Sequence, residues 1–385
     1  MNAVPLVYLD HAATTPMRPE ALEAMLAFYG ERFGNPSGSH RVARDARRAI
    51  DEARDVVASC LGSRPGEVIF TGCGTESDSL AILGVQRIRG GVAVCPAVEH
   101  HAVLDVVTNS GGRVIAVDRL GSVDLDALRD SLDASVSVVS VMAVNNEVGT
   151  ITDLAEVASV VRRYAPNAAL HTDAVQAATW LDLRALTRVV DLLSLSAHKF
   201  GGPKGVGLLY VRDGIRLDPM MRGGGQEHER RSGTHNVAGI VAMARALQVT
   251  DARRGNDIAR IGALRDRLVD GIRSEIDDVV ETVPRQRKVA GSAHLCFPGI
   301  DSESLLFLLD DAGVCASAAS ACASGAMEPS HVLSGMGVPR ERALGAVRLT
   351  VGSTTTEAEI ERAVGVVAAA VRRLRAGSVG VGVGR

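Results

Sequence analysis

The sequence predicts an α/β protein, in which helices cover a mostly parallel sheet and a smaller α+β domain follows. Short apolar runs alternate with helical stretches from about Pro16 to Val249. The runs are continuously apolar rather than alternating with polar residues, as expected for strands buried on both faces. With 385 residues, the chain is long enough for roughly two domains.

Seven segments in the first part of the chain have the length and composition of strands. They are Glu67 to Thr71, Val92 to Pro96, Arg113 to Val117, Val136 to Val144, Ala169 to Thr172, Leu192 to Ser196 and Val206 to Val211. Helical stretches, such as Glu20 to Tyr29 and Arg41 to Ser59, precede or separate most of them. The last two strands lie too close in sequence for a crossover helix, so we expect one of them to run antiparallel. The pattern predicts a mostly parallel seven-stranded sheet.

The smaller α+β domain is predicted from the elements that follow the sheet. They are a long helix from Arg253 to Ile276, a strand from Ala293 to Phe297, a helix from Ser302 to Ala312, a strand from Arg348 to Val351 and a helix from Glu357 to Arg373. We therefore assign residues 16–252 to a large domain, and residues 1–15 together with 253–375 to a small one. Residues 376–385 are rich in Gly, Val and Ser, and we expect them to be disordered.

Composition excludes several classes of protein. The formal net charge is −3 and acidic residues interleave with the arginines of the Arg41 to Arg54 stretch, so we expect no nucleic-acid surface. No apolar run approaches the ~18 residues of a membrane span. The first five residues lack a basic region and an apolar core, so we expect no signal peptide and a cytoplasmic protein. The six cysteines contain no Cys-x-x-Cys pair, which disfavours a zinc site.

Lys199 follows the predicted strand Leu192 to Ser196 and precedes a Gly201-Gly202-Pro203 turn. Ligand sites in parallel sheets lie at the carboxyl ends of the strands. A desolvated lysine at such a position has a neutral amine available to form a Schiff base. The alternative is a lysine that only solvates the end of the strand, which is the commoner case for a single lysine.

Two further strand ends carry groups that suit a flat cofactor ring. Asp173 ends a short apolar segment, where a carboxylate can keep a pyridinium nitrogen protonated. Its alternative role is a helix N-cap. His100 follows the predicted strand Val92 to Pro96, and its imidazole can stack on a ring, although a structural histidine is the alternative.

The stretch Gly72 to Ser77 follows a predicted strand and opens a helix. Free backbone N–H groups and the positive end of the helix dipole make an anion site at such a position. The stretch matches neither the dinucleotide fingerprint nor the Walker loop, and a plain strand-to-helix turn is the alternative. Taken together, an amine, a ring-nitrogen partner, a stacking group and a phosphate cradle indicate a site for pyridoxal 5'-phosphate (PLP).

Cys322 lies among small residues in the second domain, within Ala316 to Gly325. A thiol with such neighbours is accessible, and a helix start near Pro329 would modestly favour its thiolate. The alternative is an inert buried cysteine, a description that fits Cys315 better. The remaining cysteines Cys60, Cys95 and Cys296 lie in apolar runs and are expected to be structural.

A family resemblance covers residues 7 to 362. The matching stretches, in order, are Tyr8 to Pro16, Phe33 to Ser37, Cys73 to Ser79, Asn145 to Thr150, His171 to Gln176, Arg231 to Thr234, Ser320 to Gly325 and Glu328 to Val332. In these stretches the chain resembles the cysteine desulfurases among the fold-type I PLP-dependent transferases. It is most similar to their nitrogen-fixation (NifS-like) and iron–sulfur-cluster type.

The resemblance implies a role for each candidate residue. Lys199 would hold PLP covalently, Asp173 would pair with the ring nitrogen, Gln176 with the phenolic oxygen, and His100 would stack on the ring and relay protons. Gly74, Thr75, Ser196 and His198 would hold the phosphate, while Thr234 would reach the phosphate of a neighbouring subunit in a homodimer. Asn146 and Arg348 would bind the carboxylate of the substrate L-cysteine, Arg348 through a bidentate fork. Cys322 would accept the sulfur.

The implied activity is removal of sulfur from L-cysteine, giving L-alanine and a Cys322 persulfide that passes to an acceptor protein, either a scaffold or a sulfurtransferase. A selenocysteine lyase and a PLP aminotransferase are the alternatives, and an aminotransferase would not explain Cys322 in its loop. An inactive scaffold is disfavoured, since every expected residue is present. Ala197, in place of the usual glycine, and His228-Glu229, in place of an Arg-Gly pair, depart from the family pattern. Cys73 is assigned no chemistry.

Overall fold

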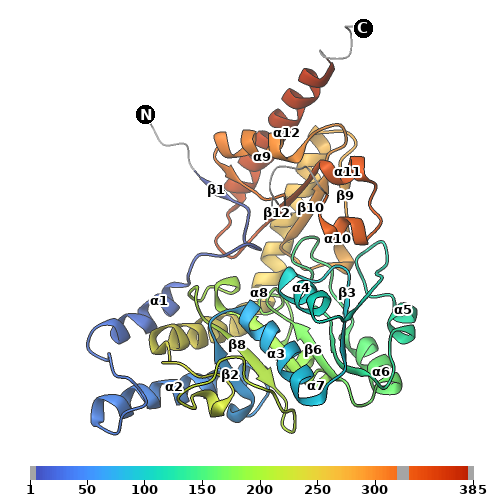
Figure 1. Cartoon of the computed structure of the whole chain (residues 1–385). Helices are drawn as coiled ribbons and strands as arrows, with labels where there is room; N and C mark the ends of the chain where they lie inside the picture. Colours follow the sequence, from blue (N-terminus) through green and yellow to red (C-terminus); the bar gives the residue numbers. More distant parts are fainter. Residues whose placement is uncertain (1–5, 319–328, 380–385) are drawn as a thin grey trace.

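The structure, a computed structural model, describes residues 6–318 and 329–379. Its described part contains a central sheet of seven strands in the order β2-β8-β7-β6-β5-β3-β4, in the lower half of Figure 1. The strands are β2 (Val68–Thr71), β3 (Val92–Pro96), β4 (Arg113–Ile115), β5 (Val136–Ser140), β6 (Ala169–Asp173), β7 (Leu192–Ser196) and β8 (Gly207–Val211). β8 runs antiparallel to both neighbours and the other pairs are parallel. The predicted sheet and its antiparallel strand are confirmed.

Helices cover both faces of this sheet because successive strand residues point to opposite faces. Ile69 and Val138 share a hydrophobic core with α3 and α4, whereas Phe70 and Val139 share one with α2, α6 and the start of α8. The helices of this part are α1 (Pro19–Leu26), α2 (Arg41–Leu61), α3 (Gly74–Arg89), α4 (His101–Asn109), α5 (Leu125–Asp130), α6 (Leu154–Tyr164) and α7 (Leu183–Val189). Burial on both faces explains why the strands read as continuous apolar runs.

A further hydrophobic core, here called the upper core, lies above the seven-stranded sheet in Figure 1. A three-stranded antiparallel sheet, β12-β10-β9, is covered by the second half of α8 and by α9 and α12. The elements are β9 (Val280–Glu281), β10 (Ser292–Cys296), α9 (Ser302–Asp311), β11 (Val314–Cys315), α10 (His331–Gly335), α11 (Arg340–Leu344), β12 (Ala346–Thr350) and α12 (Glu357–Val379). The N-terminal strand β1 (Val7–Tyr8) pairs with β11, so the start of the chain joins this core.

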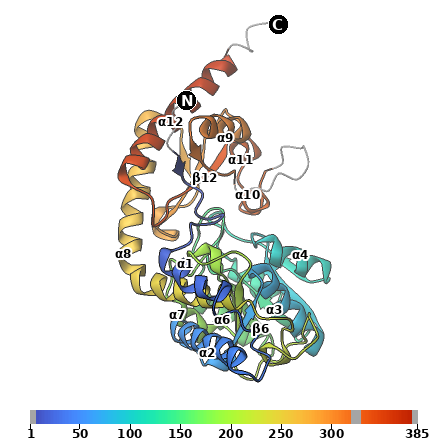
Figure 2. The ribbon, with the colours of Figure 1, turned by 90° about the vertical axis from the view of Figure 1, so that its left-hand side faces the viewer.

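The helix expected to begin at Arg253 begins sixteen residues earlier. α8 (Val237–Glu275) has 39 residues, and the Asn236 side chain caps its start by accepting a hydrogen bond from the Gly239 amide. Its first half packs in the core that α2 and α6 form on one face of the large sheet, and its second half packs in the upper core. A single helix therefore belongs to both cores. Figure 2 shows α8 running along the side of the molecule from one core to the other. The predicted domain boundary at residue 252 falls inside this helix, and the division into two domains stays a prediction.

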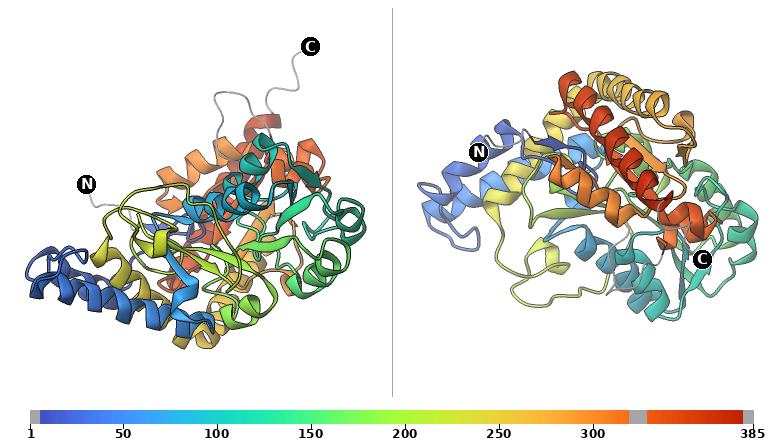
Figure 3. Two further views of the ribbon diagram at one scale, coloured as in Figure 1. Left: turned by 60° about the horizontal axis from the view of Figure 1, so that its bottom comes forward. Right: turned by 90° about the horizontal axis from the view of Figure 1, so that it is seen from above.

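The end of the chain also differs from expectation. α12 continues to Val379, so residues 376–379 are helical and not disordered as predicted. Arg375 donates hydrogen bonds to the carbonyl oxygens of Asp277 and Pro298, which fixes the turn from which the helix extends. Figure 3, viewed from above, shows α12 lying alongside the second half of α8. Residues 380–385 of the predicted tail lie outside the described residues.

Shorter differences occur at strand ends. β5 ends at Ser140 instead of Val144, although Val141 and Ala143 continue to donate backbone hydrogen bonds to β6. The predicted first helix is divided into α1 and a 3-10 turn, η1 (Ala27–Tyr29). In the part of the chain that the structure describes, every helix is too short or too polar to cross a membrane. Among the same residues no cluster of three His, Cys, Asp or Glu side chains has the arrangement of a metal site.

Candidate active site

A pocket lies at the edge of the sheet where the parallel strands β3, β5, β6 and β7 end, against the start of α3. The side chains and backbone that line it are Cys73, Gly74, Thr75, Asp78, His100, Met142, Val144, Asn146, Asp173, Val175, Gln176, Ser196, His198 and Lys199. The structure therefore brings together nine of the twelve residues predicted for the site. The exceptions, described below, are Arg348, Thr234 and Cys322.

The start of α3 forms an anion cradle on one side of the pocket. Cys73 is the N-cap, and the backbone N–H groups of the next residues have no partner inside the helix. A Cβ atom on Gly74 would lie 2.6 Å from the Val175 Cγ2 atom, so any other residue there would force Val175 to move. The hydroxyl groups of Thr71 and Ser77 lie 2.7 Å apart and both reach the Cys73 carbonyl oxygen, which fixes the turn. The 16-residue helix directs its positive dipole end into the pocket.

Lys199 enters the pocket from the short 3-10 turn η3 (Ala197–Lys199), which follows β7. Its Nζ atom donates a hydrogen bond to the carbonyl oxygen of Ala12, 2.5 Å away. Burial lowers the pKa of Lys199 to about 8, and the positive charge of Arg348 adds to the effect while Asp173 opposes it. Near pH 8 about half of the Lys199 amines are therefore neutral, whereas an ordinary lysine is almost fully charged at that pH.

Asp173 and His100 face the pocket from the ends of neighbouring strands. The Asp173 Oδ1 atom accepts a hydrogen bond from the Val175 amide at 2.8 Å, and burial raises the pKa of this carboxyl. His100 is the N-cap of α4, and its Nδ1 atom accepts a hydrogen bond from the Ala102 amide at 3.1 Å. This contact assigns the proton of the neutral ring to Nε2. Burial lowers the pKa of His100, so the ring is neutral near pH 7.

Asp78, one helical turn after Gly74, is a pocket residue to which the sequence analysis gave no role. Its side chain is 1% exposed, and its Oδ1 atom has no hydrogen-bond partner among the described residues. His171, 3.6 Å away, is neutral because burial lowers its pKa to about 3. Burial, followed by the nearby Asp173 charge, raises the pKa of Asp78. The helical spacing of four residues from the cradle was the available signal.

The N-terminal segment supplies a second group that the sequence did not reveal. The Ala12 carbonyl oxygen accepts hydrogen bonds from both Lys199 and Gln176, the latter at 2.6 Å. Gln176 is thus in the pocket as predicted, with its amide nitrogen directed to the backbone of residue 12. His198 pairs through Nδ1 with the Thr14 hydroxyl at 3.2 Å, and burial lowers its pKa to about 4. These contacts hold the segment against the η3 turn.

Arg348 lies behind the pocket on β12 and is not among the described residues that line it. Its guanidinium donates to the Asn146 carbonyl oxygen at 2.8 Å and forms an ion pair with Asp10 at 2.7 Å. Its Nε atom and the Asn146 Oδ1 atom are buried without partners among the described residues. These two unpaired groups have the donor and acceptor chemistry that an amino-acid ligand would satisfy.

The family described as Aminotransferase class-V matches residues 7–363 of the chain. The chain belongs to the aminotransferase class-V family. An IscS-like cysteine desulfurase of Mycobacterium tuberculosis is 45% identical to it over 387 residues, covering 96% of this chain and 97% of the relative. Cysteine desulfurase IscS of Dictyoglomus turgidum is 41% identical over 377 residues, covering 96% and 95%. A solved NifS-like protein superposes with a TM-score of 0.90 at 34% identity, covering 96% of this chain and all of that one.

Of the predicted residues of this class-V chain, Thr234 lies apart from the pocket. Thr234 is exposed in the loop between the 3-10 turn η4 (Glu227–Glu229) and α8, and does not line the pocket among the described residues. Cys322 lies outside the described residues. Of the other cysteines, Cys60, Cys95 and Cys296 are buried as expected, whereas Cys315 is half-buried and Cys73 is exposed in the pocket wall.

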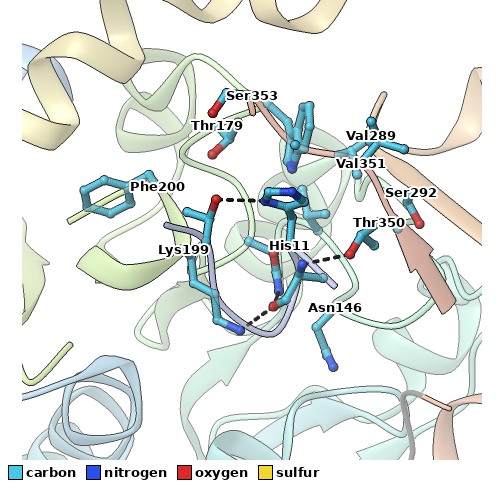
Figure 4. Close-up of a pocket in the computed structure, with 18 of the residues that line it drawn as sticks. His11, Asn146, Thr179, Lys199, Phe200, Val289, Ser292, Thr350, Val351 and Ser353 are labelled. Carbon is cyan, nitrogen blue, oxygen red and sulfur yellow. Dashed lines mark hydrogen bonds between the residues drawn. The ribbon is translucent and has the colours of Figure 1, made fainter. Parts of the chain in front are cut away.

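A rear cavity continues behind Lys199, between the N-terminal segment, β10 and β12 (Figure 4). Lys199 and Asn146 line both this cavity and the pocket. His11 projects into it and pairs with the Thr15 hydroxyl at 2.9 Å, while the buried Ser292 hydroxyl has no partner among the described residues. The site of this family member thus extends from the anion cradle to the interface between the two cores.

Proposed function

We propose that the protein is a PLP-dependent cysteine desulfurase, which converts L-cysteine to L-alanine and leaves the sulfur as a persulfide on Cys322. The observation that carries the proposal is the convergence of Lys199, Asp173 and the start of α3 on one pocket. The chain has 41–45% identity over 96% of its length to proteins named as cysteine desulfurases. A transferable sulfur implies an acceptor protein, of scaffold or sulfurtransferase type.

The pocket fits PLP in its chemistry. The cradle with its close Gly74–Val175 approach suits a phosphate, which Thr75, Ser196 and His198 would also contact. Asp173 would hold the ring nitrogen in its protonated form, His100 would lie against the ring, and Lys199 would carry the cofactor covalently. Gln176 is within reach of the same region and would contact the phenolic oxygen. When bound, PLP supplies an electron sink for charge that develops at the substrate Cα atom.

The Lys199 amine would move the protons. Because its pKa is lowered to about 8, the amine is available as a base near neutral pH. The Ala12 carbonyl oxygen accepts from its Nζ atom and so restricts where the amine points. The Asp173 side chain is buried, which would strengthen its interaction with a positive ring nitrogen.

Substrate binding would use Arg348 and Asn146. The unpaired Arg348 Nε donor is suited to a carboxylate oxygen, and the side-chain amide of Asn146 would bind the same carboxylate. The existing ion pair with Asp10 holds the guanidinium in position before substrate arrives. These contacts would place the substrate Cα proton beside Lys199.

Sulfur transfer would use the Cys322 thiolate as nucleophile. A bond forms between Cys322 and the substrate sulfur while the substrate Cβ–S bond breaks. The electron pair of the broken bond stays with the substrate carbon skeleton, which takes up a proton and leaves as L-alanine. The acceptor protein then receives the outer sulfur from the persulfide.

The test is incubation of the PLP-loaded protein with L-cysteine, with measurement of alanine, sulfide and the mass of the Cys322 peptide. We expect one additional sulfur on that peptide. Lys199→Ala should lose the borohydride-reducible link to PLP. Cys322→Ser should keep the link but form no persulfide, because a serine hydroxyl is not ionised near neutral pH.

Two matched controls make the assignment specific. Cys73→Ser removes the exposed thiol in the pocket wall, and Cys315→Ser removes the half-buried thiol beside β1. Both should retain persulfide formation on Cys322. Extra sulfur on the Cys73 or Cys315 peptide, or full turnover by Cys322→Ser, would contradict the proposal. Preference for L-selenocysteine over L-cysteine in the same assay would favour the lyase alternative.

A further inference from the structure

The first turn of α10 contacts the two loops that supply residues to the pocket. The Ser330 hydroxyl donates a hydrogen bond to the Glu147 carboxylate, and both side chains are buried. The His331 Nε2 atom donates to the Glu99 carbonyl oxygen at 2.9 Å. Glu147 follows the pocket residue Asn146 in the chain, and Glu99 precedes His100.

Apolar and ring contacts reinforce this attachment. Val332, Leu333 and Met336 of α10 share a small core with Val98 and Val148 of the same two loops. The rings of His331 and His101 lie 4.6 Å apart. The start of α10 therefore packs against the segments that follow β3 and β5, and not only against neighbouring elements such as α11.

The other end of the same chain segment is also attached to the pocket. Ser317 and Arg348 exchange two backbone hydrogen bonds, of 3.2 and 2.7 Å. The Arg348 guanidinium in turn contacts the Asn146 carbonyl oxygen and Asp10. Cys322 lies between Ser317 and Ser330 in the sequence, so both described ends of its segment are joined to residues that border the pocket.

We propose that Glu147, Ser330 and His331, here called the α10 anchor, are positioning residues for the transfer of sulfur to Cys322. This inference rests on the proposed function. A group tethered between two fixed points reacts with an effective concentration that depends on the length of the tether. If Ser330 were released from Glu147, the next fixed point would lie further along the chain. The effective concentration of the Cys322 thiol at the substrate would then fall. The anchor should therefore affect sulfur transfer and not the earlier steps at the cofactor.

The experiment separates these two stages in the PLP-loaded protein. After rapid mixing with L-cysteine, the change in cofactor absorbance reports the earlier steps. Mass spectrometry of the quenched Cys322 peptide reports sulfur transfer. We expect Ser330→Ala and Glu147→Ala to slow persulfide formation by about tenfold, the effect of losing one buried hydrogen bond, with the absorbance change unaltered.

Matched variants distinguish positioning from loss of structure. Ser330 also caps α10 by accepting a hydrogen bond from the Val332 amide, a contact that Glu147→Ala preserves. Glu147→Gln keeps an oxygen acceptor for Ser330 and should restore most of the rate. His331→Phe keeps the ring but loses the donor to Glu99, and should slow persulfide formation in the same selective way. Thr282→Val removes a part-buried hydroxyl contact to His294, next to Val283 of the same small core, and should alter neither stage.

Hydrogen exchange gives a readout that does not depend on turnover. The amides of α10 should exchange faster in Ser330→Ala and Glu147→Ala than in wild type, and Glu147→Gln should restore slow exchange. Wild-type persulfide rates in the alanine variants would overturn the inference alone, as would equal slowing of both stages. Failure of the wild-type protein to form any persulfide on Cys322 would overturn the proposed function together with the inference.

Discussion

The pKa of the Lys199 amine should control how fast the protein takes up an aldehyde cofactor. Burial, with the charge of Arg348, lowers that pKa to about 8 from a usual value near 10.5. At pH 7 about one amine in ten is then neutral, compared with about one in three thousand for an ordinary lysine. The reactive population is therefore about 300-fold larger than for an exposed lysine.

The assay uses cofactor-free protein mixed with PLP at a fixed concentration between about pH 6 and pH 10. The rate of covalent attachment should rise with pH below about 8 and level off above it, since a lowered pKa makes the neutral amine available at lower pH. A rate that still climbs steeply above pH 9 would refute the argument. Trinitrobenzenesulfonate labelling of Lys199, followed by mass spectrometry, measures the same pKa without the cofactor.

Two substitutions that remove a charge test the physical cause of the lowered Lys199 pKa. They should shift that pKa in opposite directions. The Arg348 guanidinium lowers the pKa of Lys199, so Arg348→Gln should move the levelling point to higher pH. Asp173 and Asp10 raise the same pKa, so Asp173→Asn should move the levelling point to lower pH. A shift of the levelling point in the same direction in both variants would mean that burial, and not charge, determines how far the pKa of Lys199 is lowered.

Three further predictions concern the cradle, the buried ion pair between Arg54 and Glu227, and assembly. Gly74→Ala should weaken PLP binding by tenfold or more in an absorbance titration, because its Cβ would lie 2.6 Å from Val175, whereas Gly66→Ala meets nothing within 4 Å and should not. Glu227→Gln should lower the free energy of unfolding by about 3 kcal/mol at pH 7, since it leaves the buried Arg54 charge unpaired. Burial opposes the ionised form of Glu227, but hydrogen bonds from His235 and Arg54 lower its pKa to about 2, so denaturant melts should show the loss shrinking between about pH 4.5 and pH 2. Light scattering should give a dimer, and Thr234→Ala should speed PLP release without changing the unfolding free energy, since Thr234 is exposed within one chain. A fully active monomer would contradict the cross-subunit role of Thr234.

The sheet could be predicted because strands buried on both faces leave a continuous apolar signal. The start of α8 could not, because its first half is apolar enough to pack in one core and its second half in another. No local pattern marks a helix that passes between two cores. The end of α12 was missed for a related reason, since Gly and Ser near a terminus favour disorder unless earlier turns are fixed, as Arg375 fixes them here.

The pocket was predictable where its groups are side chains at strand ends, as with Lys199, Asp173 and His100. The Ala12 carbonyl was not, because a backbone oxygen has no signature in the sequence. The Asp10–Arg348 ion pair joins residues 338 positions apart, so only the fold brings them together. The chemical roles of the predicted residues, including that of Cys322, stay predictions.

Arg348 contacts parts of the site that lie far apart in the sequence. Its guanidinium pairs with Asp10, two residues before the Ala12 carbonyl that holds Lys199, and it also contacts the Asn146 carbonyl oxygen. Its charge lowers the pKa of Lys199, and its backbone pairs with Ser317 at the start of the segment that carries Cys322. A substrate carboxylate at the unpaired Nε atom would partly neutralise that charge and raise the pKa of Lys199. Substrate binding at one guanidinium would therefore make the Lys199 amine a stronger base while lowering the fraction of it that is neutral near pH 7. It would also act on a residue already joined to one end of the Cys322 segment.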